Sequence, residues 1–196
     1  MTRRFSERRI EAGLLADVLG AARFAPSAGF SQGVELLALA DPARRERFWE
    51  LASEASWRRD GADAPGLLAA PVIVLPLADP LAYTSRYAQP DKAASSLSGL
   101  DEREWPVPYW LVDASFAAML VLLAAGDAGL GGLFFQLHGQ PAALLEGLGV
   151  PVGRVTIGAL ALGYPDPAQP LGSASHPPRR ARGNLVHLDT FESGDR

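Results

Sequence analysis

Arginine side chains gather at both ends of an otherwise acidic chain. The first cluster consists of Arg3, Arg4, Arg8 and Arg9, and the second of Arg179, Arg180 and Arg182. The formal net charge is -4, so the two clusters indicate a local anion rather than a surface for nucleic acid. The guanidinium group offers paired donors and stays charged at any working pH, which suits a phosphate. A general arginine bias of the composition explains the excess of arginine, but it leaves the position of the clusters unexplained.

The loop at residues 25–32 is the second candidate for ligand contact. It reads Ala-Pro-Ser-Ala-Gly-Phe-Ser-Gln, so most of its side chains are small or carry a hydroxyl group. A planar or polyol ligand can lie close to such a backbone. Ser27 and Ser31 have a second interpretation, because a serine in such a position often only closes a turn.

Several kinds of chemistry are excluded or disfavoured by what the sequence lacks. The chain has no cysteine, which rules out disulfides, thiolate nucleophiles and iron–sulfur clusters and predicts a cytoplasmic protein. Its histidines are His138, His176 and His187, and their spacing does not predict a zinc site. The arginines are not interleaved with stacking aromatic residues, so no nucleic-acid partner is expected.

The pattern of apolar residues predicts one α+β domain over residues 1–196, with a small, mostly antiparallel sheet packed by helices. The predicted helices are one capped by Ser6 that ends before Pro26, then 41–57, 113–127 and 141–147. The predicted strands are 34–40, 71–77, 133–137 and 155–162. Residues 79–110 show no clear pattern and are expected to form a functional or mobile loop. Residues 170–196 are expected to form an irregular tail that contributes to the ligand site or to a dimer.

The helix predicted at 113–127 is apolar all round. Its uncharged run, 114–126, is shorter than the ~20 residues that a membrane span needs. Such a helix belongs in the middle of a domain or in a subunit interface, so we expect no membrane partner.

Taken in order, these segments resemble the FMN-dependent nitroreductase family. The resemblance includes the opening 2–5, the loop 25–32 and the apolar helix. It continues through the turn 129–131, the Leu-Gly-Tyr-Pro sequence at 162–165 and the arginines from 179. No single motif is specific, but their order and separations together are. The resemblance implies a nitroreductase-like fold, with the long apolar helix at a homodimer interface and two FMN sites that each draw residues from both chains.

The resemblance also assigns roles to individual residues. Thr2, Arg3 and Arg4 match the opening motif, and Arg4 is expected near flavin N1. Around the flavin ring it implies Pro26, Ser27, Ala28, Ser31, Gln32 and Gly131, and at flavin N5 the backbone of Phe135, Gln136 and Leu137. The phosphate is expected at Arg179, Arg180 and Arg182, and the substrate pocket at Phe30, Tyr109 and Trp110. Packing against the following helix is an equally weighted alternative for Tyr109 and Trp110.

Two departures from the family pattern concern the reactive face of the flavin. Phe30 stands where the family usually has asparagine, and Gln136 stands where a glycine is common. The first removes a hydrogen bond near the ring, and the second changes access to N5.

The activity implied is a ping-pong transfer of hydride from NADH or NADPH through FMN to a nitroaromatic, a quinone or a similar small electron-poor acceptor. Because the cofactor carries the chemistry, no side chain is required as a general acid or base. Two alternatives stay open. One is a flavin-binding protein of the same fold that stores or cleaves the flavin, and the other is a non-catalytic module that binds another phosphorylated ligand.

Overall fold

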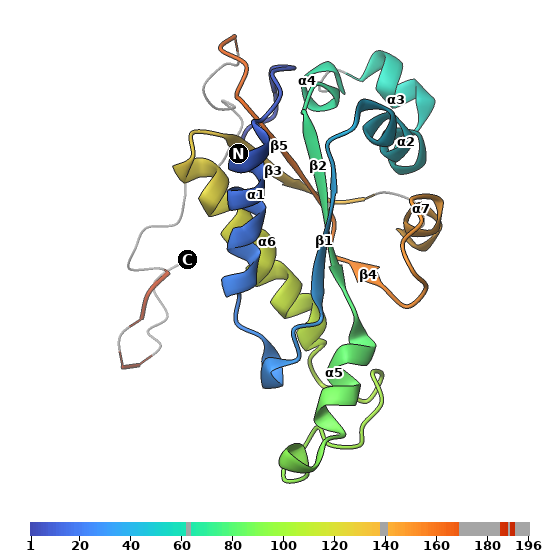
Figure 1. Ribbon diagram of the computed structural model, residues 1–196, viewed down its shortest axis with the longest axis vertical. Coiled ribbons are helices and arrows are strands. Elements are labelled where there is room, and N and C mark those ends of the chain that lie inside the picture. Colours follow the sequence, from blue (N-terminus) through green and yellow to red (C-terminus); the bar gives the residue numbers. More distant parts are fainter. Residues whose placement is uncertain (62–63, 138–140, 169–184, 188, 191–196) are drawn as a thin grey trace.

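The chain forms a five-stranded sheet in which every strand pair is antiparallel (Figure 1). A computed structural model describes residues 1–61, 64–137, 141–168, 185–187 and 189–190. The strands are β1 (Val34–Leu39), β2 (Val72–Ala78), β3 (Gly131–Phe135), β4 (Val155–Thr156) and β5 (Ala159–Gly163). Their order is β1-β2-β5-β3, and β4 pairs with β2. The α+β fold with an antiparallel sheet is therefore as predicted.

Strand β2 is the centre of the molecule, and all seven of its residues are buried. The continuous apolar run in the sequence had predicted a strand covered on both faces, and the two faces are indeed covered by different helices. One face carries α1 (Ala12–Gly20) and α6 (Tyr109–Asp127). The other face carries α2 (Pro42–Ala52), α3 (Ala55–Asp60), α4 (Ala64–Leu68) and α7 (Pro141–Gly147).

Helix α6 has one buried face and one exposed apolar face. By length and composition alone, its 19 residues could cross a membrane. Small side chains such as Ala117 and Val121 pack against the sheet and α1, as expected of a core helix. The opposite face exposes Phe116, Met119 and Leu123. The buried face confirms the predicted place of the helix in the middle of the domain, and its place in a subunit interface stays a prediction.

Four local predictions were wrong; the one over residues 41–57 is described with the candidate site below, and the other three each have a physical reason. The first helix starts at Ala12, because Glu11 caps it by accepting hydrogen bonds from the N–H groups of Gly13 and Leu14 at 3.0 and 2.9 Å. Ser6 instead lies in an extended segment whose N–H donates to the Tyr164 carbonyl at 2.9 Å.

The next two errors concern the segments 79–110 and 155–162. The segment 79–110 contains helix α5 (Pro80–Tyr87), which Asp79 caps at the N–H of Leu81. The Asp-Pro signal here is the same one that correctly predicted the start of α2 at Asp41-Pro42. The strand predicted at 155–162 is two strands, because the backbone turns at Gly158 with a φ of 142°.

Candidate functional site

The opening segment lies across the end of β3 and is held there by backbone hydrogen bonds. The N–H of Thr2 donates to the carbonyl of Gly132 at 3.1 Å, and the N–H of Phe5 donates to Gly66 in α4 at 3.0 Å. A side chain at Gly131 would overlap the side chain of Thr2. Thr2 and Gly131, both predicted contacts, are therefore brought together, and glycine is required for that approach.

Arg4 lies between α4 and the segment that follows β5. Its Nε is 3.8 Å from Oδ2 of Asp166, and the N–H of Asp166 donates to the Arg4 carbonyl at 3.1 Å. A Cβ at Gly66 would lie 2.6 Å from Cγ of Arg4, so the stem of the arginine packs directly on the α4 backbone. The Arg4 side chain as a whole is 45% exposed, so this cation lies at the surface of the protein.

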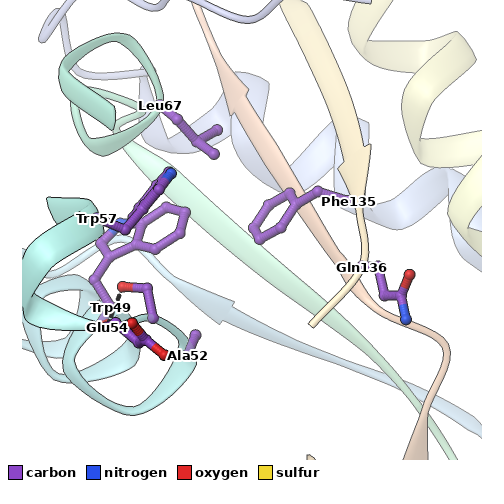
Figure 2. Close-up of a pocket in the computed structure, with 8 residues that line it drawn as sticks. Trp49, Ala52, Glu54, Trp57, Leu67, Phe135 and Gln136 are labelled. Carbon is purple, nitrogen blue, oxygen red and sulfur yellow. Dashed lines mark hydrogen bonds between the residues drawn. The ribbon is translucent and has the colours of Figure 1, made fainter. Parts of the chain in front are cut away.

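An aromatic cavity of about 460 Å³ opens beside the segment predicted to contact flavin N5 (Figure 2). Phe135 and Gln136 form one side, and Trp49, Trp57 and Leu67 form the other. The Phe135 ring stacks on Trp49, with ring centroids 5.6 Å apart and planes 14° apart. Leu67, which lines the cavity, follows Gly66, on which Arg4 packs.

Sequence reasoning missed Trp49 and Trp57, which pack with ring centroids 5.8 Å apart. It treated 41–57 as one helix, whereas α2 ends at Ala52 and α3 begins at Ala55. The signal available was two tryptophans in an otherwise polar helix. We name the group formed by Thr2, Arg3, Arg4, Gly131, Phe135, Gln136 and Leu137 the N-terminal half-site.

The residues 25–32 form a compact loop with its own hydrogen bonds. The N–H of Gln32 donates to Oγ of Ser27 at 2.8 Å, and Oγ of Ser31 donates to the Ala28 carbonyl at 2.7 Å. Both serines therefore do what the turn-closing interpretation predicted. A cavity of about 430 Å³ lies against this loop and is lined by Pro26, Ser27, Phe30, Gln32 and Asp113 among others. We name the six predicted residues Pro26, Ser27, Ala28, Phe30, Ser31 and Gln32 the loop half-site.

A buried carboxylate that sequence reasoning also missed supports this loop. Asp113 is 3% exposed. Its Oδ2 accepts hydrogen bonds from the N–H of Ala28 at 2.9 Å and from the Tyr83 hydroxyl at 2.7 Å. Hydrogen bonds to a charged group contribute about 1.5–3 kcal/mol each. Burial first, and then the hydrogen bond and charge of Asp113, raise the pKa of the Tyr83 phenol above its ordinary value.

This raised pKa predicts a loss of stability at alkaline pH. A phenol ionises near pH 10 in the unfolded chain, whereas in the folded protein Tyr83 stays protonated. Its contribution is therefore complete below about pH 10 and is lost as the pH rises further, when the unfolded state ionises first. We expect the free energy of unfolding, measured by urea titration from pH 8 to 11, to fall less steeply in Tyr83→Phe. Identical slopes for the two proteins would contradict the assignment.

Within one chain, the loop half-site and the part of the N-terminal half-site formed by Thr2 and Gly131 lie at opposite ends of α6 (Figure 1), whereas Phe135 lies at the other end of β3 from Gly131. The loop half-site bonds to Asp113 near the start of the helix, whereas Thr2 and Gly131 line one groove with Gly126 near its end. Thirteen residues at 1.5 Å each separate Asp113 from Gly126, a distance of about 20 Å. Arg179, Arg180 and Arg182 lie outside the described residues.

Tyr109 and Trp110 belong to the first turn of α6. Trp110 is buried with Tyr83 and Trp105, and the centroid of the Trp105 ring lies 5.6 Å from that of Trp110. The Tyr109 ring packs against Trp105 at 6.2 Å. Both residues therefore pack on aromatic side chains that precede α6, and not against a following helix as the alternative predicted, because they belong to that helix themselves.

Comparison with known proteins agrees with the fold. A search of curated proteins gives no match. Among solved structures, the NADPH:FMN oxidoreductase from Vibrio harveyi complexed with NAD+ has a TM-score of 0.67 and 21% identity, over 99% of this chain and 75% of that one. An FMN-dependent nitroreductase from Clostridium difficile has a TM-score of 0.65 and 20% identity, over 97% and 94% of the two chains. Nitroreductase A from Vibrio parahaemolyticus has a TM-score of 0.68 and 23% identity, over 99% and 73%.

The sequence itself matches a family model. Residues 1–164 fit the model of the nitroreductase family. The matched range contains both half-sites and all five strands. The chain therefore belongs to the nitroreductase family.

Proposed function

We propose that the protein is an FMN-dependent oxidoreductase that transfers hydride from NADH or NADPH to a nitroaromatic, a quinone or a similar small electron-poor acceptor. The family match over residues 1–164 carries this proposal. The similarity to solved structures described as FMN-dependent, one of them complexed with NAD+, supports it.

The residues of the N-terminal half-site fit an FMN molecule. Arg4 supplies a half-exposed cation, which favours the negative charge that a reduced flavin carries. The cavity beside Phe135 and Gln136 is apolar and of a size that suits a flat ring. Thr2 and Gly131 line a different groove, which runs along α6 and includes Phe134 of the same strand.

When bound, FMN would supply two-electron chemistry, accepting hydride from the nicotinamide and passing the electrons to the acceptor in a second half-reaction. The residues of this chain would bind the FMN molecule and orient its ring. Arg4 would hold its charge near N1, the backbone of residues 135–137 would face N5, and the aromatic cavity would keep water from the ring. Phosphate contacts are assigned to the arginines from 179, as the family resemblance implies.

A homodimer is part of the proposal, because one chain separates the two half-sites. In a two-fold dimer, α6 would pack against the partner's α6. The loop half-site of each protomer would then meet the N-terminal half-site of the other, which gives two equivalent sites in each dimer. The exposed Phe116, Met119 and Leu123 support α6 as this contact. A groove of about 730 Å³ along the same helix gives the face a shape that a second copy can fill.

The absorption spectrum of the purified protein tests this function. We expect a yellow protein, or one that becomes yellow when titrated with FMN, whose visible bands bleach when NADH or NADPH is added without oxygen. Addition of p-benzoquinone should restore the bands. A protein that takes up no flavin refutes the proposal. One that binds flavin but bleaches with neither nucleotide favours storage or cleavage of the flavin.

A further inference from the structure

The buried pair Asp113 and Tyr83 has no role in the contacts that the nitroreductase resemblance assigns. We propose that these two are positioning residues that hold the 25–32 loop in one conformation, and that the loop thereby presents Phe30 as a wall for flat acceptors at the partner's flavin. The inference rests on the proposed function, but its first step concerns the loop alone.

Side chains of two helices, α5 and α6, hold the loop. The Ala28 N–H donates to Asp113, which also accepts the Tyr83 hydroxyl. Nε of Arg86 donates to the Gly29 carbonyl at 3.0 Å, and Arg86 is itself fixed by two hydrogen bonds to Asp91, both of 2.7 Å. The Tyr87 ring lies beneath Gly29, where an added Cβ would approach Cε2 of that ring to 2.6 Å.

The backbone held in this way is strained. Gly29, Phe30 and Gln32 have φ values of 61°, 56° and 51°, in the left-handed region that only glycine enters freely. A bulky residue such as phenylalanine stays there only when its surroundings impose the conformation. The contacts of Asp113, Arg86 and Tyr87 supply that constraint.

The loop held in this conformation places the Phe30 side chain on the surface of the protein. Its side chain is 75% exposed in one chain, and it lines the same cavity as Asp113 and Gln32. In the proposed dimer, this loop faces the partner's flavin. An aromatic ring fixed at that place would stack on a flat acceptor, whereas a compact inorganic acceptor would gain nothing from it.

Amide hydrogen exchange of the flavin-free protein tests the first step. Asp113→Asn and the milder Tyr83→Phe should both speed exchange of the Ala28 amide, about tenfold for the former if one hydrogen bond is lost. Asp17→Asn, on an exposed position of α1, and Tyr164→Phe are the matched controls and should exchange like the wild type. Circular dichroism melts show whether each variant is folded. If the exchange rate of the Ala28 amide is unchanged in both test variants, Asp113 and Tyr83 do not anchor the 25–32 loop and the first step is wrong.

Steady-state kinetics of the FMN-loaded protein test the second step. Phe30→Ala should raise KM for p-benzoquinone about tenfold, and it should raise KM for the compact acceptor ferricyanide much less. Asp113→Asn should raise the same KM, and the double variant should be no worse than Phe30→Ala. Phe24→Ala is the matched control, since Phe24 is 73% exposed outside the predicted site.

The outcomes separate the two ideas. If Phe30→Ala behaves like Phe24→Ala, Phe30 is not a wall and the inference is wrong even though the protein is a flavoenzyme. If Asp113→Asn frees the loop without changing KM, the anchor does not serve the reaction. If the wild type binds no FMN, the proposed function fails and the role of Phe30 fails with it, while the exchange measurement still decides the anchor.

Discussion

Leu123→Glu is expected to convert the protein into monomers that no longer retain FMN. Leu123 is 62% exposed on the free face of α6, beside Met119 and on the groove that also holds Thr2 and Gly131. A carboxylate there would be desolvated without a partner when two helices pack, at a cost of several kcal/mol. If each flavin needs both chains, affinity for FMN should fall together with dimerisation, by about 100-fold or more.

Light scattering and FMN titration on the same samples measure both quantities. Val152→Glu is the control, because Val152 is 100% exposed far from α6 and should change neither. The monomer should remain folded by circular dichroism, since the buried face of α6 is untouched. A monomeric variant that keeps wild-type FMN affinity would place the whole site in one chain, and an unchanged dimer would remove this face of α6 from the interface.

The sequence predicted those elements whose signals are local. The apolar run of β2, the Asp-Pro start of α2 and the glycine end of α6 were recognised correctly because each depends on neighbouring residues alone. Gly129, for example, has the φ of 73° that its position after the helix predicted. The same Asp-Pro signal at Asp79 was overlooked, because the surrounding prolines and serines suggested a loop.

The candidate site was predicted less completely, because its supports come from distant parts of the chain. Asp113 and Ala28 are 85 residues apart, and no local pattern relates them. The aromatic cavity brings Trp49 and Trp57 to Phe135 across the sheet. The aspartate in the apolar helix was a visible sign of the Asp113 support, since such a residue is buried only when its oxygens find donors.

The relative position of the two half-sites also depends on the tertiary structure, so the sequence alone did not predict it. The resemblance gave both groups of residues, but their separation of about 20 Å follows from the length of α6. That separation is the reason why a homodimer is part of the proposed function. The exposed apolar residues Phe116, Met119 and Leu123 on α6 support the same proposal.

Arg4→Gln is expected to weaken FMN binding and to lower the reduction potential of the bound flavin. Arg4 is the cation predicted nearest flavin N1, and its ion pair with Asp166, at 3.8 Å, joins two partly exposed side chains. Loss of a charge-assisted contact of about 1.5–3 kcal/mol reduces affinity about 10- to 100-fold. The reduced flavin should be destabilised more than the oxidised one, because it alone carries the negative charge that Arg4 faces.

Titration at two salt concentrations and a dye-equilibrium potential measure the two effects. Arg4→Lys should keep most of the potential while it loses affinity, since the ammonium group retains the charge but not the planar fork. Arg47→Gln is the control, because Arg47 lies on α2 and pairs only at the surface with Glu50 at 3.1 Å. If Arg4→Gln lowers affinity and leaves the potential unchanged, Arg4 binds the ribityl or phosphate part of FMN. If neither changes, the opening segment is not part of the flavin site, and the close approach of Thr2 to Gly131 serves only the fold.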